Sequence, residues 1–269
     1  MTPEQLQQIF PNLSAAKAQA ILPALVETCR FWDMTTKPRV AAFLAQCGHE
    51  SGLFQFFTEF ASGDAYEGRA DLGNTQPGDG RRYKGRGAIQ LTGRNNYRRA
   101  GQALGQNFEA NPEIVAQMPW AMQVSGWFWR QGSARGDLNK FADGATVSVT
   151  LSEKDQNRWN NERARVGREG KDVSAFDKPA IAFDYCTLGV NGGFRGKPER
   201  DAIYARALQF LPENPLEAGA GAGAPLAQVA SRGAFRLQKK RQAEDLTVPI
   251  VALVGSVGFL VYKVLKRMR

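Results

Sequence analysis

Apolar residues recur at helical spacing through most of the first 211 residues. The pattern predicts helices within residues 4–32, at about 95–104, 112–131 and 178–189, and over 199–211. Pro38 can open a further helix that ends near Gly52, because proline is tolerated in a helix's first turn. No continuous run alternates apolar and polar residues as the strands of a large sheet would. We therefore expect a mainly α domain over residues 1–211, with at most a short hairpin.

Polar segments divide this pattern and then end it. Residues 61–82 are rich in Gly, Asp and Asn and predict a loop, and residues 144–178 predict a charged surface excursion without an assigned role. Residues 212–231 consist largely of Ala, Gly and Pro, which bury too little surface to fold. We expect this segment to be a flexible linker.

A seventeen-residue run without a charge, Leu246 to Tyr262, follows the linker. It lies between a basic juxtamembrane segment, 232–245, and a basic tail, 263–269. The length is at the short end of what crosses a bilayer core of about 30 Å. A buried core helix is the alternative, but after such a linker it has no partner to pack against. We expect one C-terminal transmembrane helix at 246–262, whose orientation the two basic flanks leave open.

The net charge of +9 raises the question of nucleic-acid binding. Nine Lys and Arg against two Asp and Glu between Arg232 and Arg269 account for +7 of it, which leaves about +2 for the predicted domain. A nucleic-acid groove needs its own basic face, so we expect no nucleic-acid partner. One histidine and three widely spaced cysteines predict neither a metal site nor a cofactor. The N-terminus lacks the features of a signal peptide.

Glu50 extends an apolar stripe on the helix that Pro38 opens. Positions 43, 47 and 50 share one face of that helix, and Phe43 and Cys47 are apolar. A carboxyl at the rim of a core is partly removed from water and therefore holds its proton more strongly. A general acid at neutral pH needs this property, so Glu50 is a candidate for that role.

A second carboxyl follows nine residues later, at Glu59. An unbroken helix would place the two about 13.5 Å apart along its axis, too far for one substrate. Gly52 allows the helix to end and the chain to turn back. Inverting glycosidases hold their two carboxyl groups about 6.5–9.5 Å apart. Glu67 competes with Glu59 for the place opposite Glu50.

The segment from Tyr83 to Tyr97 combines close glycines with neutral polar side chains. Gly85 and Gly87 allow the backbone to approach a ligand closely. The Gln, Thr, Asn and Tyr residues supply donors and acceptors that suit sugar hydroxyl and acetamido groups. The segment lacks the Gly-Lys-Ser/Thr ending of a phosphate-binding loop. Taken alone, its chemistry also fits an ordinary turn.

Three motifs together resemble glycoside hydrolase family 19, which includes chitinases and phage endolysins. They are His49-Glu50-Ser51-Gly52, the run Tyr83-Lys84-Gly85-Arg86-Gly87-Ala88-Ile89-Gln90-Leu91-Thr92-Gly93-Arg94-Asn95-Asn96-Tyr97, and Val190-Asn191-Gly192-Gly193. The resemblance spans about residues 35–211 and implies a lysozyme-like, bilobal helical domain with a substrate cleft. It also implies an inverting reaction that needs no metal.

The resemblance implies roles for residues of this chain. Glu50 resembles the family's general acid, Glu59 its general base, and Thr92 the hydroxyl that helps to hold the attacking water. The expected substrate-binding or site-orienting positions are His49, Glu67, Tyr83, Gln90, Asn96, Asn191 and Arg200. The family often has a glutamate shortly after Asn-Gly-Gly, where this chain has Phe194 and Arg195.

The expected function is a peptidoglycan hydrolase of the endolysin or lysozyme type. A chitinase acting on β-1,4-linked N-acetylglucosamine polymers is the alternative, and a glycan-binding protein without turnover is a third reading. The predicted span at 246–262 implies attachment to a virion membrane or to the host inner membrane, with the catalytic domain acting on the cell wall. Association with a virion or a holin is part of the same expectation.

Overall fold

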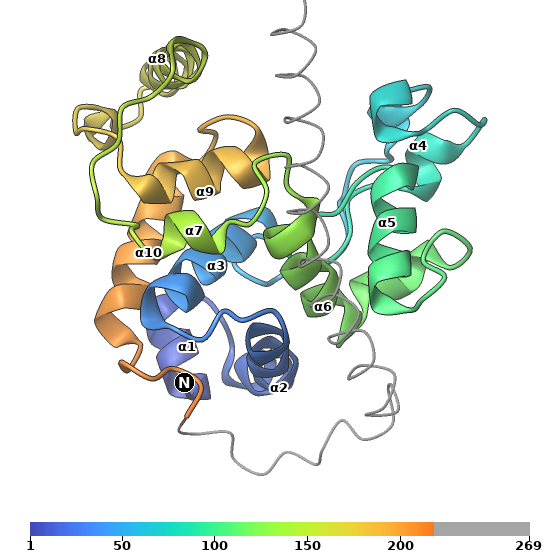
Figure 1. Cartoon of the computed structure of the whole chain (residues 1–269), viewed down its shortest axis with the longest axis horizontal. Coiled ribbons are helices and arrows are strands. Elements are labelled where there is room, and N and C mark those ends of the chain that lie inside the picture. The colour runs from blue at the N-terminus through green and yellow to red at the C-terminus, as the bar shows by residue number, and fades with distance from the viewer. Residues whose placement is uncertain (218–269) are drawn as a thin grey trace, which may run out of the picture. The chain divides into compact units, whose positions relative to one another are not determined.

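A computed structural model describes residues 1–217 of the chain (Figure 1). Its α-helices are α1 (Pro3–Ile9), α2 (Ala15–Phe31), α3 (Lys37–Glu50), α4 (Asp79–Arg82), α5 (Arg94–Leu104), α6 (Trp120–Trp127), α7 (Asn139–Ala142), α8 (Glu153–Arg168), α9 (Ala182–Asn191) and α10 (Lys197–Phe210). Within the described range, pairing between extended residues is limited to isolated bridges, such as the antiparallel bridge between Arg86 and Leu91. The expectation of a mainly α domain is confirmed.

Helix α3 lies at the centre of the larger group of helices (Figure 1). Residues 40–48 are all buried, so α3 is enclosed on every side. It packs mainly on α10 and also contacts α7 and α9. Pro38 stands in its first turn, as the sequence predicts. Because α3 ends at Glu50, the carboxylate stands where the buried helix reaches the surface.

Helices α4 and α5 lie apart from α9 and α10 in Figure 1, and α6 joins the two groups. Helix α5 packs on α6 and on η2, a single 3₁₀ turn at Ala70–Leu72. Helix α4 contacts η1, a similar turn at Asp64–Tyr66. The predicted loop at 61–82 therefore contains short helical turns between its irregular parts.

The helical pattern at 112–131 is divided into three elements. A 3₁₀ segment, η3 (Pro112–Ala116), precedes α6, and a π-helical turn, η4 (Phe128–Gly132), follows it. Pro119 stands between η3 and α6. Proline lacks a backbone N–H and fixes its own φ angle, so a continuous helix cannot pass this position undisturbed. The apolar period was visible in the sequence, but the break was not predicted.

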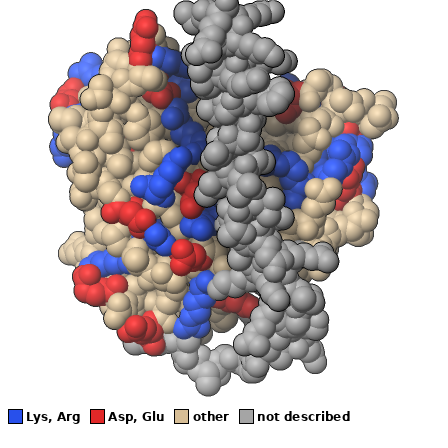
Figure 2. All heavy atoms as spheres, in the orientation of Figure 1, with Lys and Arg blue, Asp and Glu red and all other residues tan. Residues whose placement is uncertain are grey.

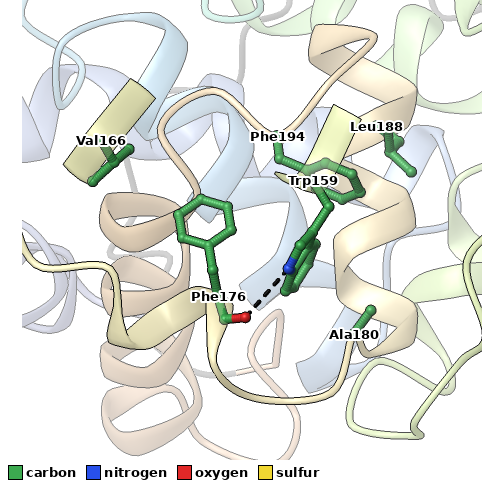
Figure 3. Close-up of a cluster of buried hydrophobic side chains, with 6 residues drawn as sticks. All are labelled: Trp159, Val166, Phe176, Ala180, Leu188 and Phe194. Atoms are coloured by element: carbon green, nitrogen blue, oxygen red, sulfur yellow. Dashed lines mark hydrogen bonds between the residues drawn. The ribbon is translucent and has the colours of Figure 1, made fainter. Parts of the chain in front are cut away.

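The charged segment 144–178 carries helix α8 and a small core of its own (Figure 3). Trp159 of α8 is buried and meets the rings of Phe176 and Phe194 edge-on, at centroid distances of 5.3 and 5.0 Å. Its indole N–H donates to the Phe176 carbonyl at 3.3 Å. The polar composition predicts the outer face of this segment but not the cluster beneath it.

Residues at the start of the predicted linker contact the N-terminal helices. The Lys37 ammonium pairs with Glu213 at 2.9 Å, and Arg30 donates to the Leu216 carbonyl. No helix within residues 1–217 is both long and apolar enough to span a bilayer. The predicted transmembrane helix at 246–262, its basic flanks and most of the linker lie outside the described residues.

Candidate active site

Glu50 meets a buried arginine at the end of α3. One carboxylate oxygen of Glu50, Oε1, pairs with a terminal nitrogen of Arg200 from α10. The Glu50 side chain is 20% exposed, whereas that of Arg200 is fully buried. Arg200 also donates to the side-chain oxygen of Gln46 and, at 3.0 Å, to the Arg195 carbonyl. Arg200 is thus enclosed by acceptors and cannot itself reach a substrate in this structure.

Gln46 connects the arginine to a third helix. Gln46 lies one turn before Glu50 on α3. Its amide nitrogen donates to the hydroxyl of Thr187, on α9, at 2.9 Å. Both residues are buried. A buried charge needs partners to offset its lost hydration, and this network supplies them to Arg200. The position of Glu50 is therefore determined jointly by α3, α9 and α10.

His49 lies beside this network and is held from α10. Its Nδ1 atom hydrogen-bonds to the Glu199 carboxylate. This contact lowers the pKa of Glu199, because a charged or hydrogen-bonding imidazole favours the carboxylate. Gly196, with φ at +74°, lies flat against the imidazole, where a Cβ atom would clash with the ring. Glu199 thus supplies a carboxylate near the site, although none follows the Asn-Gly-Gly motif directly.

The chain reverses immediately after Glu50. Gly52, Leu53 and Phe54 have φ angles of 58°, 61° and 60°, three consecutive residues in the left-handed region. Such angles are unfavourable for bulky side chains and persist where the surrounding structure holds them. The Leu53 N–H bonds back to the Gly48 carbonyl at 2.6 Å. This turn directs the chain away from α3 and toward the glycine-rich segment.

Glu59 is held by three hydrogen bonds, two to Gly85 and one from Tyr66. The Glu59 N–H donates to the Gly85 carbonyl, and the Gly85 N–H donates to the carboxylate, both at 2.9 Å. The Tyr66 hydroxyl donates to the other carboxylate oxygen at 2.9 Å. Burial and the contact with Glu59 raise the pKa of Tyr66 to about 12, so its hydroxyl keeps its proton and remains a donor.

Gln90, Thr92 and Asn96 are gathered around the same glycine-rich turn. A Cβ atom on Gly85 would lie 2.8 Å from the Gln90 side-chain oxygen. Gln90 itself has a left-handed φ of 56°. The Thr92 hydroxyl donates to the Gln90 carbonyl at 2.9 Å, and the Asn96 amide donates to the Thr92 carbonyl at 2.8 Å. All three are partly exposed. They form one polar group beside Glu59.

Three predicted residues lie outside these groups. The Tyr83 side chain is buried, and its hydroxyl donates to the Glu109 carbonyl at 2.9 Å. Glu67 accepts the backbone N–H groups of Gly78 and Gly80 at 2.7 and 2.8 Å, so both of its oxygens are occupied. Asn191 is exposed and is the last residue of α9.

Three residues that the sequence did not single out complete the site: Gln46, Tyr66 and Glu199. Gln46 lies one turn before Glu50 on α3, so the two side chains share a face of the helix. This spacing could have identified Gln46 from the sequence. Tyr66 lies seven residues after Glu59, whose carboxylate it contacts. Glu199 lies 150 residues after His49, whose imidazole it contacts. The bends at 60–63 bring Tyr66 back to Glu59, and the loop at 192–196 brings Glu199 to His49.

Acidic and basic side chains lie beside one another on the visible face of the domain (Figure 2). Many are paired: Arg94, for example, contacts Asp79 and Glu109. Within residues 1–217 no group of three or more His, Cys, Asp or Glu side chains is arranged to hold a metal ion. The described site consists of carboxylates, one imidazole, one guanidinium and neutral polar groups, which together can move protons and stabilise charge.

Comparison with known proteins gives consistent matches. The family model described as "Chitinase class I" matches residues 14–157, more than half of the chain. A "Glycosyl hydrolase family 19 domain-containing protein" of Haemophilus influenzae is 31% identical, over 46% of this chain and 74% of that protein. An endochitinase of Arabidopsis thaliana is 38% identical, over 42% of this chain and 40% of that protein. This chain therefore spans only two fifths of the plant relative.

Among solved structures, chitinase C from Streptomyces griseus is similar, with 24% identity and a TM-score of 0.48. The similarity covers 78% of this chain and 75% of that one. The family assignment depends on the sequence matches, which include both the Glu50–Glu59 region and the glycine-rich segment. This chain belongs to glycoside hydrolase family 19, the family of the class I chitinases.

Proposed function

We propose that this protein hydrolyses β-1,4 glycosidic bonds, with Glu50 as general acid and Glu59 as general base. One observation carries the proposal: the two carboxylates have different partners. Glu50 faces the guanidinium of buried Arg200, whereas Glu59 accepts from two neutral donors, the Tyr66 hydroxyl and the Gly85 N–H. A pair of carboxyl groups in unlike surroundings suits the division into acid and base.

The surroundings of Glu59 suit a base that activates water. Tyr66 and Gly85 hold the carboxylate in place without neutralising its charge, so it can accept a proton from water. Thr92 belongs to the same polar group and is the hydroxyl that we assign to positioning that water. Direct attack of an activated water on the far face of the sugar inverts the anomeric centre.

The surroundings of Glu50 stabilise the carboxylate that remains after it has given up its proton. Within residues 1–217, Arg200 is the partner that pairs with the Glu50 carboxylate, and it does so through Oε1. Oε2 can then approach the glycosidic oxygen. When Glu50 gives up its proton, the guanidinium already stands beside the new carboxylate. Charge stabilisation by a group that is fixed in advance requires no reorganisation during the reaction.

We further propose peptidoglycan as the substrate and 246–262 as a membrane anchor that keeps the domain near the cell wall. The uncharged run with basic residues on both sides supports the anchor. Chitin is the second candidate, because sequence relatives from Arabidopsis thaliana and Solanum lycopersicum are named as endochitinases. Both polymers contain β-1,4-linked N-acetylglucosamine, so the carboxylate pair suits either one.

Substitution of the carboxylates tests the reaction. In the full-length chain, Glu50→Gln and Glu59→Gln should each lower kcat by about 10²–10⁴-fold, the typical contribution of a positioned acid or base. Glu67→Gln, whose carboxylate is occupied by two backbone N–H groups, is the matched control and should stay within about twofold of wild type. Loss of activity in Glu67→Gln with retention in Glu59→Gln would reverse the assignment of the base.

The substrate is tested separately. The full-length protein is added to chloroform-treated Gram-negative cells, and release of reducing ends is compared between purified murein and colloidal chitin. Falling turbidity together with faster release from murein supports peptidoglycan. Release from chitin alone, at unchanged turbidity, replaces it with chitin, and no release from either polymer refutes the glycosidase proposal. Mass spectrometry of the murein fragments identifies the sugar at the new reducing end.

A further inference from the structure

Two exposed aromatic rings lie together close to Glu59. Within residues 1–217, the large apolar side chains that remain exposed are Phe56, Phe60 and Val147, with 46%, 80% and 61% of their surface accessible. The rings of Phe56 and Phe60 meet edge-on, with their centroids 4.5 Å apart. Single exposed apolar residues are common, but a pair in mutual contact next to polar machinery points to a ligand.

The backbone that carries the pair is held at both ends. The Phe56 N–H donates to the Ser51 carbonyl at 2.9 Å, and its ring lies 3.2 Å from the position of a Cβ on Gly52. Phe60 directly follows Glu59, whose backbone and carboxylate are both bound to Gly85. The two rings are thus attached to the segment that leads from the candidate acid to the candidate base.

The surroundings of the pair favour a neutral ligand. Residues 51–63 contain no Lys or Arg, which a segment that binds an anionic membrane surface or a nucleic acid would be expected to carry. Two lysines reach the segment from other elements, but the ammonium groups of Lys17 and Lys84 are bonded to the Gln55 and Ala61 carbonyls. Pyranose rings combine apolar C–H faces with polar edges. An exposed aromatic face can remove the C–H face from water while the hydroxyl groups remain hydrated. Glu59 lies one residue away and, under the proposed function, faces the bond that is cut.

We propose that Phe60, backed by Phe56, is a sugar-stacking subsite that binds a pyranose ring of the glycan at a distance from the scissile bond. This inference rests on the proposed glycosidase function and adds a specificity for chain length to it. A ring that is stacked equally in the ground state and in the transition state lowers KM without changing kcat. Only glycans long enough to reach Phe60 gain from the contact.

The test compares Phe60→Ala, Phe60→Leu and Phe60→Trp in the full-length protein, with Val147→Ala as a control at another exposed apolar residue. The substrates are soluble N-acetylglucosamine oligomers and soluble peptidoglycan strands, each in a short and a long form. Phe60→Ala and Phe60→Leu should raise KM for the long form about tenfold, roughly the effect of one aromatic contact. Neither should change kcat or the short-form KM, and Phe60→Trp should retain the wild-type KM.

Two measurements separate this inference from the proposed function. Binding of the long oligomers is measured by calorimetry in Glu50→Gln, with and without Phe60→Ala. Weaker binding in the double variant supports the subsite even where turnover is absent. Normal turnover with an unchanged long-form KM in Phe60→Ala overturns the subsite alone, as does wild-type behaviour of Phe60→Leu. A change from dimer to monomer, or a loss of vesicle binding, in Phe60→Ala also overturns it. Absence of both turnover and binding in wild type refutes both proposals.

Discussion

At Gly85 the backbone lies close to both the Glu59 carboxylate and the Gln90 amide. Its N–H and carbonyl are both bonded to Glu59 at 2.9 Å. A Cβ atom at this position would lie 2.8 Å from the Gln90 oxygen and 3.1 Å from a Glu59 carboxylate oxygen. Both distances are too short for a relaxed contact, so the ends of these two side chains would have to move. Glycine therefore leaves room for the Glu59 carboxylate and the Gln90 amide in their present positions.

We expect Gly85→Ala to lower kcat by about 10–100-fold, because a shift of about 1 Å in a reacting group is enough for such a loss. Steady-state kinetics with chitin oligomers or murein measures it, and the thermal midpoint should stay within a few degrees. The control is Gly167→Ala, in the last turn of α8, where the nearest atom to a new Cβ lies at an ordinary 3.6 Å. Equal kinetics of the two alanine variants would show that the Gly85 contact has no role in catalysis.

Helix α8 is the element whose role the sequence did not reveal. Its charged outer surface covers Trp159, which packs on Phe194 in the loop between α9 and α10 (Figure 3). The hydrogen bond from Arg165 and, to a smaller extent, that from the Gly196 backbone lower the pKa of Glu162 on the same helix, so Glu162 is a charged acceptor for that loop. Gly196 in turn lies against His49. Helix α8 therefore supports the loop that lies against the imidazole.

Trp159→Ala should destabilise the domain by about 3–5 kcal/mol, the usual effect of removing a large aromatic side chain from a core. Urea unfolding followed by circular dichroism measures this change. Asn161→Ala, at an exposed position of the same helix, should change the free energy of unfolding by less than about 0.5 kcal/mol. A Trp159→Ala variant as stable as the Asn161 control would mean that α8 is not packed as described.

Over the whole domain, carboxylates in unlike surroundings make stability depend on pH in opposite directions. Arg98 and Arg94 lower the pKa of Glu109 to about 2. Its contribution to stability is therefore present above the ordinary pKa near 4.5 and is lost as the pH falls toward 2. Burial raises the pKa of Asp201 to about 6 despite the nearby Lys197. Its protonated form favours folding, and this contribution is lost as the pH rises from about 4 through 6.

Chemical unfolding at a series of pH values tests these signs. Glu109→Gln should be less stable than wild type at pH 6, and the difference should shrink as the pH falls toward 2. Asp201→Asn should gain stability relative to wild type between pH 4 and pH 7, because it has no charge to bury. Differences that do not vary with pH in either variant would show that these two carboxylates titrate alike in the folded and unfolded chain.

The sequence predicted the helices whose formation depends on the spacing of neighbouring apolar residues. The apolar period located α2, α3, α5 and α10 to within a few residues, because a helix buries one face at a fixed spacing. Its motifs also predicted Glu50, Glu59 and the glycine-rich segment as the candidate site. It did not predict the break at Pro119, because the apolar spacing continues on both sides of the proline. It also did not predict the core beneath α8, because the partners of Trp159 come from separate parts of the chain.

The sequence by itself determined the helical class and the family and supplied the candidates for proton transfer, since these follow from the local spacing of apolar residues and from the residues within the motifs. Only the tertiary structure decided that Arg200 is buried against Glu50, that Tyr66 and Gly85 hold Glu59, and that the oxygens of Glu67 are occupied elsewhere. The physical reason is that a side chain's charge state and reach depend on neighbours brought to it by turns. The left-handed turn at 52–54 and the packing of α10 on α3 provide those neighbours here.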